Sequence, residues 1–286
     1  MLETNPNGKK QNILFDVDTI IDKSLKVKSG KSPHFKRKES CQILSCHPLD
    51  DLDMLELIEE IYTQIKGNWK HACFQQGSKE NWRFKLNPEI SLRNKSPEVK
   101  LERAIARIVK ASPLERDCWA NQVPTASGLV PPHNDKHRNI DLIHRCAEGE
   151  YEFIELKVAD STPLYAAMEI LLYGLLYVLR RRKPMSQEAI IESEDTLKQR
   201  ALLKADLIHL RVLTPSEYYK GYDLAWLEGK MREGLSKMVD VWELPFKMDF
   251  EFQYMPSIKT DDLTTDIADH RIEEMLRNRQ PFYGPK

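Results

Sequence analysis

The chain has 286 residues, of which 41% are hydrophobic and 30% are charged, and its formal net charge is −1. This length and composition are typical of a soluble globular protein with enough apolar residues for a substantial core. A net charge so close to zero excludes nucleic-acid binding driven by the field of the whole molecule, so any such contact must come from a local basic patch.

Neither a secretory leader nor a membrane span is predicted. The first residues, MLETNPNGKKQN, are polar and contain no apolar core segment. The longest apolar stretch, from Ala166 to Leu179, is interrupted by Glu169 and is short for a bilayer. The five cysteines are scattered and form no Cys-x-x-Cys pair, which favours a reducing compartment. We therefore expect a cytoplasmic protein with no membrane partner.

The first third of the chain is predicted to lie outside the main domain. Residues 1–45 resemble a basic, flexible N-terminal arm, because the stretch over 23–38 is rich in lysine and arginine and contains no acidic residue. Such an arm is either a solvated, mobile segment or a phosphate-binding one. Residues 46–95 form a second subregion, with an amphipathic helix over 49–66 and extended signals over 81–94.

Residues 96–256 are predicted to form the core domain. Ser96 suits the N-cap and Pro97 the first position of a helix over 96–112. The elements that follow are three strands, a long buried helix, a strand, a helix and a late strand, over 118–126, 138–146, 151–159, 162–182, 205–215, 223–242 and 248–256. The order helix, three strands, helix, strand predicts an α/β (α+β) fold with a mixed central sheet flanked by helices. Residues 257–286 are expected to be a C-terminal helix and tail.

The second and third predicted strands form a hairpin. A three-residue loop connects them, and it ends at Gly149, which suits the left-handed position that commonly ends such loops. This loop pairs Cys146 with Glu150. The same register, continued outward, places Asp141 opposite Glu155.

That register gathers charged groups on one face of the sheet. Directly opposed residues project from the same face, and Lys157, two residues after Glu155, shares the face of Glu155 and Asp141. The apolar neighbours expected on the opposite face are Ile140, Leu142, Ile154, Leu156 and Val158. Charged groups on otherwise apolar strands are costly unless they are paired, bound to metal or catalytic.

These residue types match metal-assisted hydrolysis of a phosphodiester. Two carboxylates this close repel one another, and a divalent cation relieves the repulsion. Hard oxygen ligands suit Mg²⁺ or Mn²⁺. Such a cation polarises a phosphate oxygen and lowers the pKa of a bound water, while Lys157 orients that water or stabilises developing negative charge.

The Glu-x-Lys pattern alone is not specific. It occurs three times, at Glu98, Glu155 and Glu228, and only the second lies on an apolar predicted strand with an acid opposite. The alternative is a salt-bridged trio at the end of a sheet. Two acids and one base in apolar surroundings leave one charge unpaired, which argues against it.

The segments NIDLIHR and EFIELKVA, read together, resemble the PD-(D/E)xK nuclease superfamily, which has a restriction-endonuclease-like core of the order helix-strand-strand-strand-helix-strand. The resemblance covers residues of about 97 to 214. The proline of the family's Pro-Asp pair is absent, since Ile140 precedes Asp141.

This resemblance implies roles for individual residues. Asp141 and Glu155 would bind the metal with help from the backbone carbonyl of Leu156. Lys157 would be the catalytic lysine, and Glu102 on the first core helix would be the additional acid that many members carry.

The segment EILLY, Glu169 to Tyr173, resembles the Q-L-x-x-Y motif of RecB-like members. Glu169 stands in place of the glutamine and Ile170 in place of the leucine. The resemblance implies that Glu169 and Tyr173 contact the substrate. A helix that packs its tyrosine and leucines against the sheet is the alternative for Tyr173.

Two more polar residues are candidates for substrate contacts. Gln122, next to Asn121 on the first core strand, could contact a phosphate or a metal-bound water, and the alternative is ordinary strand-end hydrogen bonding. Arg138 precedes the strand of Asp141 and could meet a phosphate.

The sequence therefore predicts an Mg²⁺- or Mn²⁺-dependent nuclease, acting on DNA rather than RNA, by internal or terminal cleavage. One alternative is a catalytically inactive module of the same fold that binds nucleic acid or protein. The other is a similar mixed sheet in which the charged trio has only a structural role. Many nucleases of this fold are dimers, so a homodimer is an expectation that the resemblance carries.

Overall fold

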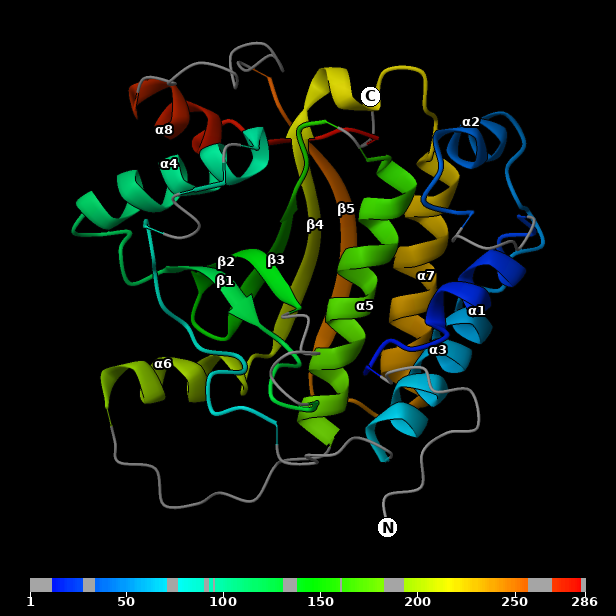
Figure 1. Cartoon of the computed structure of the whole chain (residues 1–286), viewed down its shortest axis with the longest axis horizontal. Coiled ribbons are helices and arrows are strands. Elements are labelled where there is room, and N and C mark those ends of the chain that lie inside the picture. Colours follow the sequence, from blue (N-terminus) through cyan, green and yellow to red (C-terminus); the bar gives the residue numbers. More distant parts are fainter. Residues whose placement is uncertain are drawn as a thin grey trace.

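The fold is built on a six-stranded sheet with helices on both faces (Figure 1). The computed structural model describes residues 12–27, 34–70, 77–89, 93–94, 96–130, 138–159, 161–182, 193–256 and 269–283. The sheet mixes parallel and antiparallel neighbours, which confirms the predicted fold class of a mixed sheet flanked by helices.

The strands lie in chain order across the sheet. They are β1 Trp119–Pro124, β2 Asn139–Ala147, β3 Glu150–Leu156, β4 Leu207–Pro215, β5 Lys247–Met255 and β6 Gln280–Pro281. The first three form an antiparallel meander, β3–β4 and β4–β5 are parallel, and β6 is antiparallel to β5. A parallel step needs a crossover, and the long helix between β3 and β4 provides it.

One face of the sheet carries the larger core. The helices α5 Pro163–Arg182 and α7 Ala225–Val241 pack on this face, and α3 Met54–Lys70 and α1 Val17–Ser24 lie behind them (Figure 1). Thr162 caps α5, because its hydroxyl oxygen accepts a hydrogen bond from the N–H of Tyr165 at 3.1 Å.

Helices α4 Pro97–Ala111 and α8 Asp269–Arg277 lie together on the opposite face (Figure 1). The predicted N-cap of α4 is confirmed, since the Ser96 hydroxyl accepts from the N–H of Val99 at 3.4 Å. These helices and the sheet enclose a second, smaller core. Leu142, Ile154, Leu156 and Val158 belong to it as predicted, whereas Ile140 lies in the larger core.

Helix α5 is the one described helix that is long and apolar enough to cross a membrane by length and composition. Its mean hydropathy is 1.3, and 83% of the apolar window is buried inside the fold. A helix buried in this way has the properties of the core helix of a soluble protein.

The N-terminal segment differs from the flexible arm expected over 1–45. Its described part contains α1 and α2 Lys38–Cys46. Val17, Ile21 and Leu25, spaced four residues apart, are fully buried in the larger core. This helical spacing anchors the segment, while Lys23, Lys26 and Lys38 in its described part are exposed. Residues 1–11 and 28–33 of the predicted arm lie outside the described residues.

Three more elements were not predicted, and one of them is the short strand β6 within the expected C-terminal helix and tail. Helix α6 Glu194–Leu202 precedes β4, and its sequence is too polar to give a strong apolar pattern. A short 3-10 helix, Ser216–Tyr219, follows β4. The extended signals over 81–94 do not produce a strand in the described part of that segment, although Trp82 and Phe84 are buried.

The β2–β3 hairpin has the predicted register except at its turn. Leu142 pairs with Ile154, which places Asp141 opposite Glu155. At the turn, Ala147 rather than Cys146 pairs with Glu150, because the register shifts by one residue and Cys146 is left in a bulge. Gly149 has a φ of 73°, as the loop prediction required.

Candidate active site

Four carboxylates and one ammonium group meet near the open end of the β2–β3 hairpin. Glu102 comes from α4, Asp141 from β2, Glu155 from β3 and Glu169 from α5, and Lys157 follows directly after β3. We call these five residues the acidic site. The structure therefore brings together all four predicted catalytic residues and one residue predicted to bind substrate.

Lys157 lies between two of the carboxylates. Its Nζ is 2.5 Å from Glu155 Oε1 and 3.0 Å from Glu169 Oε2. The hydroxyl of Tyr165 donates to Glu169 Oε1 at 3.0 Å, and the Tyr165 ring centre is 5.7 Å from Lys157 Nζ. Since Tyr165 and Glu169 are one helical turn apart, α5 holds the partner of the lysine in place.

Glu102 and Asp141 form the other half of the acidic site. The Glu102 carboxylate, only 2% exposed, accepts from Asn121 Nδ2 and from Gln122 Nε2, both at 2.9 Å. The same Gln122 Nε2 is 3.4 Å from Asp141 Oδ1. The N–H of Leu156 donates to Asp141 Oδ2 at 2.9 Å and so ties this half to β3. The predicted role of the Leu156 carbonyl as a metal ligand stays a prediction.

Burial makes the carboxyl groups of the acidic site hard to ionise. It raises the pKa of Glu102 to about 8, with a further contribution from Asp141, and the pKa of Asp141 to about 6. Burial, with Asp141 and Glu169 nearby, also raises the pKa of Glu155 well above its usual value. Burial alone would raise the pKa of Glu169, but the Lys157 ammonium lowers it below its usual value.

The same carboxylates hold Lys157 in its charged form. Burial alone would lower the pKa of Lys157, but Glu155, Glu169 and Asp141 raise it above its usual range. One ammonium group cannot neutralise four carboxyl groups, and this leaves an excess of potential negative charge in a buried place.

The donor types of the acidic site suit a divalent cation, although no three of its carboxylates offer ligand atoms within 4.8 Å of one another as the site stands. Glu155 Oε2 is buried and has no hydrogen-bond partner among the described residues. A buried carboxylate oxygen without a partner is costly, and coordination of a cation would satisfy it. The donor set consists of carboxylate oxygens, which are the ligands that Mg²⁺ and Mn²⁺ prefer.

Three of the four predicted substrate contacts lie on one side of the acidic site. Arg138, Glu169 and Tyr173 line one pocket, together with Tyr165 and Lys36. Gln122 instead lies on the other side, between Glu102 and Asp141, where it bonds to carboxylates.

Three residues of this region were missed by sequence analysis. Lys36 comes from the segment expected to be a flexible arm, and its Nζ is 5.3 Å from the ring centre of Tyr165. Asn139 donates to Gln122 Oε1 at 3.1 Å. Only Tyr165 had a usable signal, because it precedes Glu169 by four residues on a well-marked helix.

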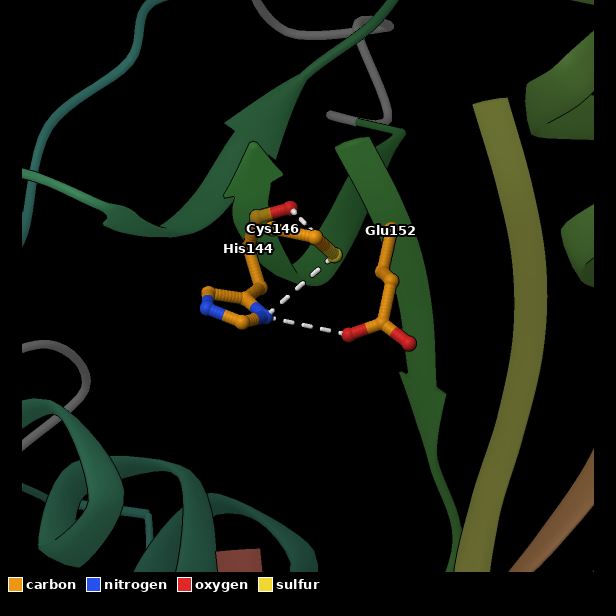
Figure 2. A group of neighbouring side chains, drawn as sticks. All are labelled: His144, Cys146 and Glu152. Atoms are coloured by element: carbon orange, nitrogen blue, oxygen red, sulfur yellow. Dashed lines mark hydrogen bonds and ion pairs between the residues drawn. The ribbon is translucent and has the colours of Figure 1, made fainter. Parts of the chain in front are cut away.

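A second ionisable cluster lies on the same hairpin, toward its turn. His144 Nδ1 is 3.0 Å from Glu152 Oε2 and 3.6 Å from Cys146 Sγ (Figure 2). In the part of the chain that the structure describes, these three residues are the one group whose His, Cys and carboxylate ligand atoms lie close enough together to hold a metal ion.

Arginines already neutralise the acid of this second cluster. Arg279 Nη2 donates to Glu152 Oε2 at 2.9 Å, and Arg211 Nε is 3.8 Å from Glu152 Oε1. Burial alone would raise the pKa of Glu152, but His144, Arg279 and Arg211 hold it well below its usual value. We call these four residues the arginine cluster. A cation bound there would have to displace a guanidinium group.

Comparisons of the chain with protein-family models, with curated proteins and with solved structures found no match.

Proposed function

We propose that the protein is an Mg²⁺- or Mn²⁺-dependent nuclease of the PD-(D/E)xK type, which hydrolyses phosphodiester bonds of DNA in the cytoplasm. The observation that carries the proposal is the excess of buried carboxylates around Lys157, with Glu155 Oε2 left without a partner among the described residues. A divalent cation would balance this charge and satisfy that oxygen.

Asp141, Glu155 and Glu102 would hold the cation, with the Leu156 carbonyl as an additional ligand. When bound, the cation would polarise a phosphate oxygen and lower the pKa of a bound water. Binding also requires that the carboxyl groups lose their protons. Their raised pKa values mean that cation and protons compete for the acidic site.

Lys157 acts as a charged group rather than as a base. Its raised pKa keeps the ammonium protonated at neutral pH, so it has no free electron pair with which to take a proton from water. It can donate hydrogen bonds to the attacking water or to the phosphate oxygens as negative charge develops. Glu169 and Tyr165 are positioning residues, since they fix the direction of the lysine.

The pocket beside the acidic site is lined by two cations, Arg138 and Lys36, and by two acids, Asp18 and Glu169. Lys36 already pairs with Asp18 at 2.8 Å, so Arg138 is the cation of this pocket that can meet a phosphate, while Tyr165 and Tyr173 add aromatic surface. Phosphate contacts of this kind supply affinity that does not depend on sequence and that weakens with salt.

A cleavage assay tests the proposal. Purified protein is incubated with linear DNA, circular DNA and RNA, each with Mg²⁺, Mn²⁺ or a chelator. We expect cutting of DNA that needs the cation and that is lost in Lys157→Ala. Lys198→Ala is a matched control, because Lys198 forms its ion pairs with Asp117 and Glu194, which are not part of the acidic site.

Two other outcomes would contradict the proposal. Binding of DNA without cutting in any cation would favour an inactive binding module. Cutting that persists in Lys157→Ala would mean that the acidic site does not perform the reaction.

A further inference from the structure

Gln122 has a backbone conformation that few residues of its type adopt. Its φ is 46°, in the left-handed region, although it lies inside β1. Neighbouring residues of a regular strand point to opposite faces, yet Asn121 and Gln122 both donate to the Glu102 carboxylate. The left-handed residue provides the rotation that makes this shared contact feasible. Such strained conformations cluster at functional sites.

The Gln122 amide nitrogen occupies the place between two carboxylates. Nε2 is 2.9 Å from Glu102 Oε2 and 3.4 Å from Asp141 Oδ1. It carries two protons and no acceptor, so it presents partial positive charge to both acids. A divalent cation held by Glu102 and Asp141 would need the same two oxygens.

The orientation of this amide depends on Asn139. Asn139 Nδ2 donates to Gln122 Oε1 at 3.1 Å, which directs Gln122 Nε2 toward the acids. The other end of the Asn139 amide, Oδ1, is buried and has no hydrogen-bond partner among the described residues. A buried acceptor without a donor indicates that this pair of amides is satisfied only in part as it stands.

We propose that Gln122 is a switchable cation ligand: its amide nitrogen bonds to Glu102 and Asp141 in the metal-free protein, and its Oε1 binds the cation together with these two acids after the amides of Gln122 and Asn139 rotate. Rotation about the terminal torsions exchanges nitrogen and oxygen with little movement of other atoms. Asn139 Oδ1 then accepts from Gln122 Nε2, while Glu102 Oε2 and Asp141 Oδ1 are released to the cation. This inference rests on the proposed cation site, but not on the cleavage reaction.

The test measures Mn²⁺ affinity by electron paramagnetic resonance, since bound Mn²⁺ loses the sharp signal of the free ion. Gln122→Met keeps the length of the side chain but removes both amide groups. Asn139→Leu keeps the number and branching of the side-chain heavy atoms, removes both amide groups and leaves Gln122 intact. We expect each variant to weaken Mn²⁺ binding, Gln122→Met by about tenfold or more and Asn139→Leu by several-fold.

Gln199→Met is the matched control, because Gln199 bonds to main-chain carbonyls of Lys79 and Asn81 rather than to the acidic site. We expect it to bind Mn²⁺ like the wild type. Thermal unfolding without metal is measured for every variant, so that loss of folded protein is not mistaken for loss of affinity.

The outcomes separate this inference from the proposed nuclease activity. If Gln122→Met binds Mn²⁺ as tightly as the wild type, or more tightly, Gln122 is only a structural clamp and the inference is wrong. The inference is also wrong if the wild type binds no Mn²⁺. If the variants weaken Mn²⁺ binding but the wild type cuts no nucleic acid, the ligand switch stands and the nuclease proposal fails.

Discussion

The β2–β3 hairpin carries two buried ionic clusters whose charge balance differs. In the arginine cluster, Glu152 faces two guanidinium groups and a histidine, and its pKa lies well below its usual value. In the acidic site, four carboxyl groups accompany one ammonium group, Lys157 contacts two of them, and burial raises the pKa of Asp141 and Glu155. The acidic site therefore needs an added cation to balance its carboxylates, whereas the arginine cluster is already balanced.

This difference separates a structural ionic cluster from a candidate functional one. A carboxylate whose charge is balanced by arginines contributes to the folded state and has little affinity for a cation. Carboxylates in excess destabilise the folded state until protons or a cation balance them, and such costs are typical of sites that perform chemistry. Substitutions in the two clusters should consequently have opposite effects on stability and activity.

The largest expected effect is on cleavage in Glu155→Gln. The neutral amide removes a proposed cation ligand, so we expect the cleavage rate to fall by about 100-fold or more. The same change replaces a carboxyl group that burial makes hard to ionise with a neutral amide, so the free energy of unfolding without metal should stay equal or rise. Chemical denaturation and a cleavage assay on the same preparation test both parts. A Glu155→Gln variant that is less stable than the wild type but still active would mean that Glu155 has a structural role and not a catalytic one.

Glu152→Gln should show the opposite behaviour. It leaves Arg279 without its carboxylate partner, whereas Arg211 keeps Asp249 at 2.6 Å, and removing one partner of a buried ion pair costs about 3 kcal/mol. We expect the free energy of unfolding to fall by an amount of this order, measured in urea. Cleavage by the protein that remains folded should be unchanged, and a specific loss of cutting would assign Glu152 to the reaction.

The acidic site should also make stability depend on pH. Since the pKa of Glu102 is raised to about 8 in the folded protein, the stability that this group contributes is fully present below about pH 4.5 and is lost as the pH rises through 8. We therefore compare the free energy of unfolding of metal-free Glu102→Gln with that of the metal-free wild type. As the pH rises from 4.5 to 8, the variant should become more stable relative to the wild type by on the order of 2 kcal/mol. A difference between the two proteins that does not change with pH would contradict the prediction.

Tyr165→Phe should have the smallest effect. It removes only the hydrogen bond to Glu169 Oε1, which corresponds to about 1 kcal/mol. We expect the cleavage rate to fall by about fivefold at unchanged cation affinity, because Tyr165 positions Lys157 through Glu169. An equal loss in cation affinity would place Tyr165 among the groups that hold the metal.

The sequence predicted the local part of the acidic site. Alternation along two strands and one short loop placed Asp141, Glu155 and Lys157 together, and the register is confirmed away from the turn. The order of helices and strands in the core was also predictable, because each element has a strong periodicity and clear boundaries. Glu102 required the resemblance as well as the amphipathic pattern of its helix.

The remaining parts depend on contacts that a local pattern does not contain. Lys36 reaches the pocket because α1 packs against α3 and so anchors the N-terminal segment to the core. The lysine-rich sequence of that segment favours a mobile arm instead. Gln122 turns toward Glu102 because its own backbone is in the left-handed region. The alternation rule assumes a regular strand and would have placed Gln122 on the opposite face from Asn121. The partnership of Glu169 with Lys157 joins a helix to a strand end, and no spacing within either segment predicts it.

Locating the cation would decide between the two clusters. A crystal grown with Mn²⁺ and measured for its anomalous signal should show a peak between Asp141 and Glu155, with Glu102 nearby and the arginine cluster empty. A crystal in which Mn²⁺ binds at His144, Cys146 and Glu152, or one with no peak at the acidic site, would contradict the proposed cation site.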